Sequence, residues 1–482
     1  MRFRQIFRLI GILNFFLGLS MLAPLTISII YSDGSFFPLL YSFIITSGAG
    51  ITLFFLIGKI NYLSLSQREG MAIVTFGWLT AGFFGSLPFL FSGSIGTLTN
   101  AYFESISGFT TTGASILANI ESLPEGILFW RSQTQWMGGM GIIVLSIAIL
   151  PFLGVGGMQL YKAEVPSPVV DKLQPRISET AKTLWKVYLF ITLLEIGLLF
   201  IGGMPLFDSI CHAFCTMPTG GFSTQNGSIA QYNSAYFDGV ITFFMIIAGI
   251  NFSLHFKFLK GDFKVFGRDP ECRVFLLILA ILILLVTFNI YGSIYYSISH
   301  ALRLAAFQVT SIITTTGFVT ANYATWPALS QIIIVLCMFI GAMAGSTGGG
   351  IKIMRIILLA KHGYQEIFRL IHPHAVRSIK LGGKPVPAEV LNSIWGFFIL
   401  YLGLFIVAVI IMCLIGLDIP TSFASVAATI GNVGPGFGLV GPVNNYLSVP
   451  DLGKWVLIFC MILGRLEIYT VIIMVAPAYW RK

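Results

Sequence analysis

Four short loops along the chain combine glycine with threonine, proline or asparagine in a recurring pattern. Their central glycines are Gly113, Gly221, Gly317 and Gly434, at intervals of roughly 100 residues. Each loop follows a short apolar stretch and precedes a long one. A single Thr-Gly pair would predict only a turn, but four in the same setting predict a structural repeat. The candidate residues of these loops are Thr111, Thr112, Gly113, Thr219, Gly220, Gly221, Thr315, Thr316, Gly317, Asn432, Val433 and Gly434.

The chemistry that suits these loops is the binding of a dehydrated monovalent cation. Such an ion needs oxygen dipoles in place of its lost water, and backbone carbonyls from several loops facing one axis can supply them. Pointing successive carbonyls the same way requires positive φ, which glycine adopts at little steric cost. The segment Asn432 to Gly436 resembles the T-V-G-Y-G pattern of potassium filters. Because no charged residue lies inside the loops, a divalent cation or an anion is disfavoured, and we expect a potassium filter.

A second glycine-rich segment, from Gly341 to Lys352, interrupts an apolar stretch. Each glycine costs a helix roughly 0.8–1 kcal/mol against alanine, so the helical pattern resumes only at Ile353. Unwound backbone within a membrane is tolerated where it is buried in protein or lines a cavity, so we expect this segment to face a pore. It is not a Walker loop, because Ile351 follows the glycines, and a plain linker is the alternative. The candidate gate consists of Gly345, Ser346, Thr347, Gly348, Gly349, Gly350, Lys352 and, from the last span, Arg465.

A few charged residues lie inside or beside apolar stretches. Arg465 is in the middle of the last span, where an arginine is costly and by default marks function; pairing with a carboxylate for packing is the alternative. Glu104 and Asp208, near the loops, either raise the local cation concentration or are ordinary solvated acids. Arg131 is interpreted as an anchor near the outer end of its span, and Glu195 as a structural carboxylate.

The elements that must carry these residues are membrane helices. Charged residues make up 10% of the 482 residues and hydrophobic residues 56%, with a mean hydropathy of +0.88. An average soluble domain has about 25% charged residues, so an ordinary cytosolic enzyme, a disordered chain and a nucleic-acid binder are excluded. Neither the six cysteines nor the group Cys211, His212 and Cys215 has the spacing of a disulfide framework or a metal site. Ten spans are predicted, near residues 8–31, 36–57, 71–91, 127–150, 184–204, 235–256, 274–292, 328–344, 394–416 and 453–478.

Four further apolar stretches are too short to cross a membrane and are predicted to be re-entrant, at residues 98–109, 207–217, 299–313 and 421–430. The first span has a basic start like a signal peptide, but it is too long and lacks a cleavage site, so we expect a retained helix. Basic residues collect in alternate loops, which the positive-inside rule makes cytoplasmic. Both termini are then cytoplasmic, and every short stretch falls on the outer side. The net charge of +9 therefore reflects topology.

With these features, the sequence resembles the TrkH family of bacterial Trk potassium uptake systems, in the Trk/Ktr/HKT superfamily. The resemblance covers essentially the whole chain and rests on the four loops, Trp130-Arg131-Ser132, Trp136 to Gly141, Gly341 to Lys352 and Gly464 to Glu467. It implies that four unequal repeats surround one pore and that glycine at all four filter positions accompanies potassium preference. It also implies that the Gly341–Lys352 segment blocks the cytosolic half of the pore, with Arg465 beneath the filter as a cation barrier.

The resemblance further implies a homodimer in the lipid of the bacterial inner membrane. A cytosolic, TrkA-like ring subunit that binds NAD(H) and adenine nucleotides is the expected partner. Potassium is then the transported ion, no permanently bound cofactor is expected, and nucleic acid is not a partner.

The expected fold is an all-α polytopic membrane protein, with two N-terminal helices and four helix–pore-loop–helix repeats around one central pore. The predicted units are an N-terminal helix pair at 1–68 and pore repeats at 69–160, 161–268, 269–385 (with the intramembrane glycine gating loop) and 386–482. The expected function is potassium uptake through a gated carbonyl filter. The alternative is a secondary transporter, a potassium:proton or potassium:sodium symporter, although that class usually has inverted repeats. We expect no enzyme, because no nucleophile with a placed base is recognised.

Overall fold

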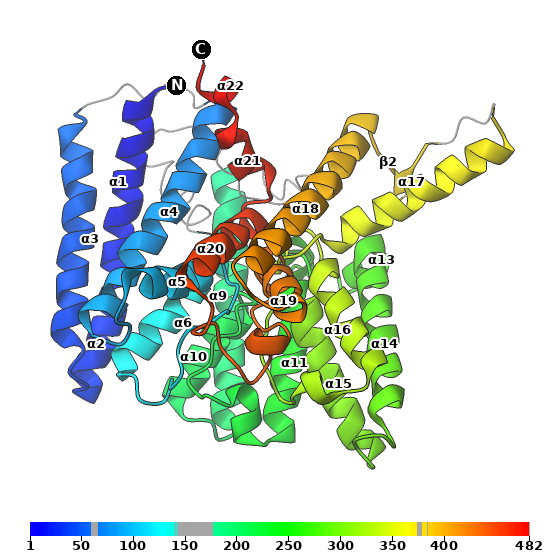
Figure 1. Ribbon diagram of the computed structural model, residues 1–482, viewed down its shortest axis with the longest axis horizontal. Helices are drawn as coiled ribbons and strands as arrows, with labels where there is room; N and C mark the ends of the chain where they lie inside the picture. Colours follow the sequence, from blue (N-terminus) through cyan, green and yellow to red (C-terminus); the bar gives the residue numbers. More distant parts are fainter. Residues whose placement is uncertain (59–65, 140, 142–176, 374–377, 383, 482) are drawn as a thin grey trace.

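The computed structural model describes residues 1–58, 66–139, 141, 177–373, 378–382 and 384–481, and the regular structure of this part of the chain is almost entirely helical. Figure 1 shows the two chain ends together at one end of the molecule. This arrangement agrees with the prediction that both termini lie on the same side of the membrane. That this side is the cytoplasm stays a prediction.

The N-terminal pair consists of α1 (Phe3–Ser20), which continues into α2 (Leu22–Tyr31), and α3 (Phe36–Leu56). Helices α1 and α3 pack closely at Gly11 and Gly50. A Cβ added to Gly11 would lie 2.9 Å from the Gly50 carbonyl oxygen, and one added to Gly50 would lie 2.6 Å from that of Gly11. Small residues allow this close packing of membrane helices, so the first span is an integral part of the fold.

Asp33, between α2 and α3, connects this pair to the rest of the protein. Its carboxylate accepts hydrogen bonds from Ser28, Ser35 and the backbone amide of Gly126, in the first turn of α6 (Glu125–Gly139). Burial alone would raise the pKa of the Asp33 carboxyl, but these hydrogen bonds outweigh it and hold the pKa below its ordinary value. Asp33 is therefore a charged anchor for the start of α6.

Four successive groups of helices follow the N-terminal pair. The first group contains α4 (Gln67–Phe91), α5 (Leu98–Phe109) and α6 (Glu125–Gly139). The second contains α9 (Ile177–Ile201), α10 (Leu206–Thr216), η2 (Ser228–Tyr232), α11 (Ala235–Gly249), α12 (Phe252–Leu259) and α13 (Val265–Arg268). The third contains α14 (Pro270–Ile290), α15 (Ile298–Ile313), η3 (Tyr323–Thr325), α16 (Ala328–Ile340), α17 (Ile353–Ile371) and the antiparallel strands β1 (Lys380–Leu381) and β2 (Lys384–Pro385). The fourth contains α18 (Ala388–Leu414), α19 (Ile419–Ile430), η4 (Gly438–Val440), α20 (Asp451–Arg465), α21 (Tyr469–Val475) and α22 (Pro477–Trp480).

This order confirms the all-α fold with two leading helices and four similar groups. The residue limits of the predicted repeats stay predictions, and the limit between 160 and 161 lies outside the described residues. The four predicted short helices are present as α5, α10, α15 and α19. They are deeply buried: every residue of α5 from Ala101 to Phe109 is shielded from solvent.

The predicted spans at 235–256 and 453–478 are interrupted in the structure, which the sequence analysis did not expect, whereas the expected break at the glycine-rich segment of the third group is present. Helices α11 and α12 meet at an angle of 103°, α16 ends at Ile340, and α20 ends at Arg465 before α21 begins at Tyr469. At these breaks Asn251 caps α12 through the amide of Ser253, Gly341 has a φ of 73°, and Glu467 has a φ of 57°. In the first group α6 ends at Gly139, and the rest of the predicted span at 127–150 lies outside the described residues, apart from Gly141. Hydropathy did not reveal the breaks after α11 and α20 because both sides of each of these two breaks are apolar.

By length and composition, six described helical segments can cross a membrane, or seven if α11 and α12 form one span. The segments of α3, α14 and α18 are only 28% buried within the protein, although they are strongly apolar. An apolar surface of this kind is stable against lipid, so these helices form the outside of the bundle. Helix α17 leads away from the bundle toward the β1–β2 hairpin (Figure 1).

Candidate functional site

The four short helices end in the same backbone geometry, just before the glycine loops (residues 110–114, 218–222, 314–318 and 431–436). At the end of α5, the amide of Thr111 donates to the Gly108 carbonyl at 3.0 Å, and the amide of Thr112 donates to the Ser107 carbonyl at 2.9 Å. Equivalent pairs of hydrogen bonds end α10, α15 and α19. This is the Schellman arrangement, which satisfies the last carbonyls of a helix. The same local backbone conformation therefore leads from each short helix into its glycine loop.

The left-handed residue of each cap is a threonine or an asparagine. The value of φ is 54° at Thr111, 58° at Thr219, 61° at Thr315 and 53° at Asn432. For β-branched threonine this backbone conformation is a genuine outlier. Strain of this kind persists where the surrounding structure fixes it, and it clusters at functional sites. Two residues later the central glycines are also left-handed, with φ between 76° and 96°, as the sequence predicted for loops that direct several carbonyls.

The four glycine loops form a closed ring. Each central glycine approaches the backbone carbonyl that precedes the central glycine of the next loop. An added Cβ would lie less than 3.0 Å from that oxygen, and the pairs are Gly113 with Gly220, Gly221 with Thr316, Gly317 with Val433, and Gly434 with Thr112. The fourth loop thus contacts the first, and all four surround one axis. Any side chain at a central glycine would collide with the neighbouring loop.

The ring presents neutral oxygen dipoles. Its threonines are buried, and in the first and third loops hydroxyls pair within the loop, Thr110 with Thr112 and Thr314 with Thr316, each at 2.8 Å. No acidic or basic residue belongs to the loops. Carbonyls arranged around one axis without a carboxylate can replace the hydration shell of a monovalent cation.

Gln135, on α6, supports the second loop and was missed by the sequence analysis. Its side-chain amide donates to the Gly220 carbonyl at 2.7 Å, and its side-chain oxygen accepts from the Phe222 amide at 3.1 Å. Similarly, the side-chain amide of Asn432 donates to the hydroxyl of Thr112 at 2.9 Å. Both contacts join two different repeats, so the loops hold each other in register. The only sequence signal for Gln135 is a polar amide within an apolar helix.

Glu104 and Arg131 form a buried ion pair behind the ring, which corrects both interpretations of Glu104 and the interpretation of Arg131 as an anchor. The Arg131 guanidinium donates to Glu104 Oε1 at 2.7 Å and to the Ser223 carbonyl at 2.9 Å, and it lies 3.6 Å from the centroid of the Phe222 ring. Both side chains are at most 2% exposed. The carboxylate also accepts from the amide of Ile116. Glu104 is therefore not solvated; the pair connects the first short helix to the exit of the second loop.

The segment from Gly341 to Lys352, called here the 341–352 loop, lies directly against the ring. The Gly349 amide donates to the hydroxyl of Thr315 at 2.7 Å. An added Cβ on Gly348 would lie 2.9 Å from the Thr314 carbonyl oxygen. The Thr347 hydroxyl donates to the carbonyls of Met217 and Ala248, at 2.9 and 3.2 Å. The loop thus contacts residues next to the second and third glycine loops, and its glycines permit this close approach.

Arg465 connects the 341–352 loop to the first repeat. Its guanidinium donates to the Thr347 carbonyl at 2.8 Å and to the carbonyls of Gly138 and Gly139 at the end of α6. The carbonyl end of a helix carries partial negative charge, which favours a cation. Glu467 pairs with Arg355 of α17. The structure therefore brings Arg465 together with Thr347, as the sequence analysis expected of the two parts of the gate.

Lys352 closes the loop at its other end. It is 3% exposed, and its ammonium donates to the Gly348 carbonyl. Its backbone adopts a φ of 77°, unusual for a residue with a side chain. The loop is thus held from within by Lys352 and from outside by Arg465.

The remaining candidates lie apart from the ring axis. Asp208 is half-buried and accepts from the hydroxyl of Thr224 at 2.7 Å, so it is not a fully solvated acid. His212 is buried and hydrogen-bonded to the Asp208 carbonyl and the Ser223 hydroxyl. Glu195 is buried in α9, and its structural role stays a prediction. Within the described ranges, no group of three or more His, Cys, Asp or Glu residues is arranged to hold a metal ion.

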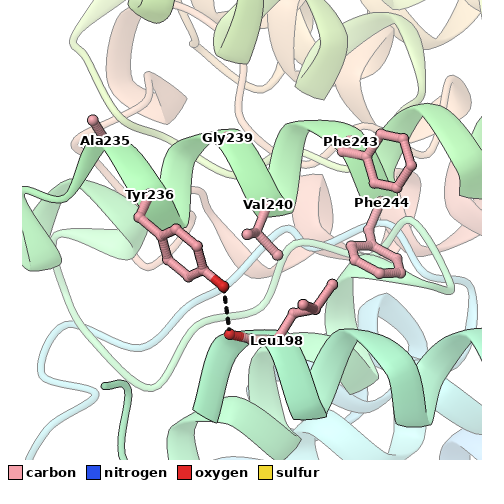
Figure 2. A pocket seen from close by; sticks show the side chains of 7 residues that line it. All are labelled: Leu198, Ala235, Tyr236, Gly239, Val240, Phe243 and Phe244. Atoms are coloured by element: carbon pink, nitrogen blue, oxygen red, sulfur yellow. Dashed lines mark hydrogen bonds between the residues drawn. The ribbon is translucent and has the colours of Figure 1, made fainter. Parts of the chain in front are cut away.

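A cavity of about 410 Å³ lies between α9 and α11 (Figure 2). It is lined almost entirely by apolar atoms, including the side chains of Leu198, Val240, Phe243 and Phe244. The Tyr236 hydroxyl at its edge donates to the Leu198 carbonyl at 2.9 Å. Because this cavity offers almost no polar group, it is not suited to an ion.

Three comparisons relate the chain to known proteins. Residues 39–482 match the model of the TrkH family, described as cation transport proteins. The chain is similar to the Trk system potassium uptake proteins TrkH of Salmonella typhimurium and Escherichia coli, with 44% identity in each case over 100% of both chains. Among solved structures, it is similar to the crystal structure of the potassium transporter TrkH from Vibrio parahaemolyticus, with 40% identity, a TM-score of 0.90 and 100% of both chains covered.

Proposed function

The chain belongs to the TrkH family of cation transport proteins, and from that premise we propose that it takes up potassium ions through a filter of backbone carbonyls. The names of its relatives support potassium as the ion. The carbonyls of Thr112, Gly220, Thr316 and Val433 would form one layer of the filter. Potassium is then the substrate, and the protein is a transporter rather than an enzyme.

The observation that carries this proposal is the closed sequence of glycine-to-carbonyl contacts around the four loops. A ring of neutral oxygen dipoles is the arrangement that replaces the water of a potassium ion. Glycine is required at each of the four positions because a Cβ would collide with the next carbonyl. The strained left-handed residues before the glycines are consistent with a functional purpose of the loops.

The 341–352 loop is the proposed gate. It lies against the third glycine loop through the bond from Gly349 to Thr315, and Arg465 holds it to the first repeat. A guanidinium on the conduction path would repel a permeating cation. Opening therefore requires that the loop and Arg465 separate.

The membrane location and the assembly of the protein are inferred from its family resemblance. We place it in the bacterial inner membrane as a homodimer surrounded by lipid, with both termini in the cytoplasm. A TrkA-like ring subunit that binds NAD(H) or adenine nucleotides would supply regulation. The potassium ions in the filter are transported, and no permanently bound cofactor is proposed.

A symporter that couples potassium to protons or sodium is the second candidate. The breaks after α11, α16 and α20 favour it, because discontinuous helices are typical of ion-coupled transporters. The four groups of helices, in contrast, each repeat the same order of helix, short helix, loop and helix, which favours a filter on one axis.

The experiment that tests the proposal measures rubidium and sodium flux into liposomes that contain only this chain. We expect rubidium to enter far faster than sodium, driven by its own gradient and unaffected by an imposed proton gradient. Equal entry of both ions would contradict the filter. Rubidium accumulation driven by a proton or sodium gradient alone would instead favour the symporter.

A further inference from the structure

One buried carboxylate joins the two ends of the 341–352 loop. Glu271 lies in the first turn of α14 and is 7% exposed. Its Oε1 accepts a hydrogen bond from the Ala344 amide at 2.8 Å and another from the Met354 amide at 3.1 Å. Ala344 lies near the start of the loop, and Met354 is the second residue of α17, so the same oxygen contacts the start of the loop and the helix that follows it.

This double contact limits how far the loop can move. Two amide nitrogens that donate to one oxygen at ordinary hydrogen-bond distances lie no more than about 6 Å apart. If a swing of the loop away from the axis moves Ala344 or Met354, at least one bond to Glu271 has to break, or Glu271 has to move with the loop.

Charged side chains also surround the base of the loop. Lys352 is buried there and donates to the Gly348 carbonyl within the loop. Arg355, in the first turn of α17, forms an ion pair with Glu467, which follows Arg465 by two residues in the chain. The loop base is therefore fixed by charged side chains from the third and fourth repeats.

We propose that Glu271 is a positioning residue that latches the 341–352 loop in its closed conformation. This inference rests on the proposed gate. It adds a second point of control, away from the filter and from Arg465.

The position of Glu271 also connects the latch to α13 and to the β1–β2 hairpin. Directly before it lie Pro270, the first residue of α14, and the short helix α13 with its basic neighbours Lys264 and Arg268. The turn of the β1–β2 hairpin also approaches: a Cβ added to Gly382 would be 3.4 Å from Pro270. A displacement of α13 or of this hairpin would move the side chain of Glu271 and would thereby affect both ends of the loop.

The test compares Glu271→Ala and Glu271→Gln in the full chain, reconstituted alone in liposomes. Removing the carboxylate leaves two buried amide donors without their acceptor in the closed state only, which shifts the equilibrium toward opening. We expect Glu271→Ala to raise rubidium uptake at least tenfold. Glu271→Gln keeps one oxygen without the charge, so a smaller increase is expected. The ratio of rubidium to sodium flux should stay within twofold of wild type in both variants.

Two controls separate the possible failures. Glu366→Ala removes an exposed acid that pairs with Arg369 on α17, and it should change nothing. Deletion of Ser346 to Gly350 should raise flux and shows that the assay detects an open gate. If the deletion raises rubidium flux while neither Glu271 variant does, the proposed role of Glu271 is wrong, whereas the proposal that the 341–352 loop is the gate is retained. If rubidium and sodium enter wild type and the deletion variant equally, the filter proposal fails.

Folding is checked by thermal unfolding and by elution as a single species. If Glu271→Ala does not fold, Glu271→Gln decides, and unchanged rubidium flux in that variant would overturn the latch. A collapse of ion preference in either variant would also overturn it, because Glu271 would then support the filter rather than the loop.

Discussion

The ring of glycine loops and the 341–352 loop are both rich in glycine, yet they are built in opposite ways. The ring repeats one backbone design four times: a Schellman cap, a left-handed residue and a glycine that faces the next carbonyl. The 341–352 loop occurs once, and side chains from several repeats hold it in place. Glycine serves the ring by excluding a side chain where backbones meet. In the single loop it permits close packing against the ring and a break in the helix.

This difference indicates which part can move. Displacing one glycine loop would disturb its contacts with both neighbouring loops, so the ring is stable as a unit. The 341–352 loop donates hydrogen bonds to Thr315 and Glu271 and accepts hydrogen bonds from Arg465 and Lys352. Each of these bonds can break while the ring stays intact. We therefore expect substitutions in the two regions to change different properties, ion preference in the ring and total flux in the loop.

The largest effect is expected from a side chain within the ring. Gly113→Ser and Gly317→Ser each place a Cβ against the carbonyl of the next loop, so the preference for potassium over sodium should fall at least tenfold. Reversal potentials in proteoliposomes measure this ratio. Gly292→Ser is the matched control, because Gly292 has a φ of 78° but, within the described part of the chain, no heavy atom within 4 Å of its added Cβ. Unchanged ratios in both ring variants would remove the basis for the filter.

The next effect concerns the loop and leaves the ring intact. Deleting Ser346 to Gly350, or replacing Arg465 by Ala, should raise cation flux through the chain alone, by about tenfold or more if each removes a few kcal/mol of closed-state stability. Rubidium uptake into liposomes measures it, with Arg369→Ala as an exposed control. Wild-type flux in both variants would show that the loop is not a barrier.

A third prediction concerns the scaffold behind the ring. Glu104→Gln breaks a buried ion pair and leaves Arg131 without its charge partner, which typically costs about 3–5 kcal/mol. We expect a lower unfolding temperature in detergent. Glu366→Gln breaks a pair whose side chains are both 51% exposed, where about 0–1 kcal/mol is usual. Equal stability of the two variants would contradict a structural role of the buried pair.

The smallest effect tests the direct contact between the two regions. Thr315→Val removes the hydroxyl that accepts from Gly349, whereas the hydroxyl of Thr111, at the equivalent position of the first loop, has no hydrogen-bond partner among the described residues. Thr315→Val should therefore raise rubidium flux severalfold, and Thr111→Val should leave it near wild type. The same flux in both variants would mean that the contact with Gly349 does not hold the loop.

Much of this arrangement could be predicted from the sequence because it is local or repeated. The short helices end at the same Thr-Gly and Asn-Val-Gly signals, and the break after Ile340 follows from its glycines. The bends after Gly249 and Arg465 escaped prediction because their flanks are equally apolar, and hydropathy does not register a change of direction.

The contacts between residues far apart in the chain, within one repeat or between two repeats, could not be predicted at all. Glu104 meets Arg131, Gln135 meets Gly220, and Glu271 meets Ala344 across 27, 85 and 73 residues. Nothing in the local pattern distinguishes these polar residues from solvated ones. Only the packed fold shows that each is buried and which partner it has.

Anomalous X-ray scattering from crystals of this chain grown in thallium, a monovalent ion that substitutes for potassium, would locate the bound ion. The filter model predicts a peak on the axis enclosed by the carbonyls of Thr112, Gly220, Thr316 and Val433, and its loss in Gly113→Ser. Thallium bound only elsewhere, or a peak that persists unchanged in Gly113→Ser, would contradict it.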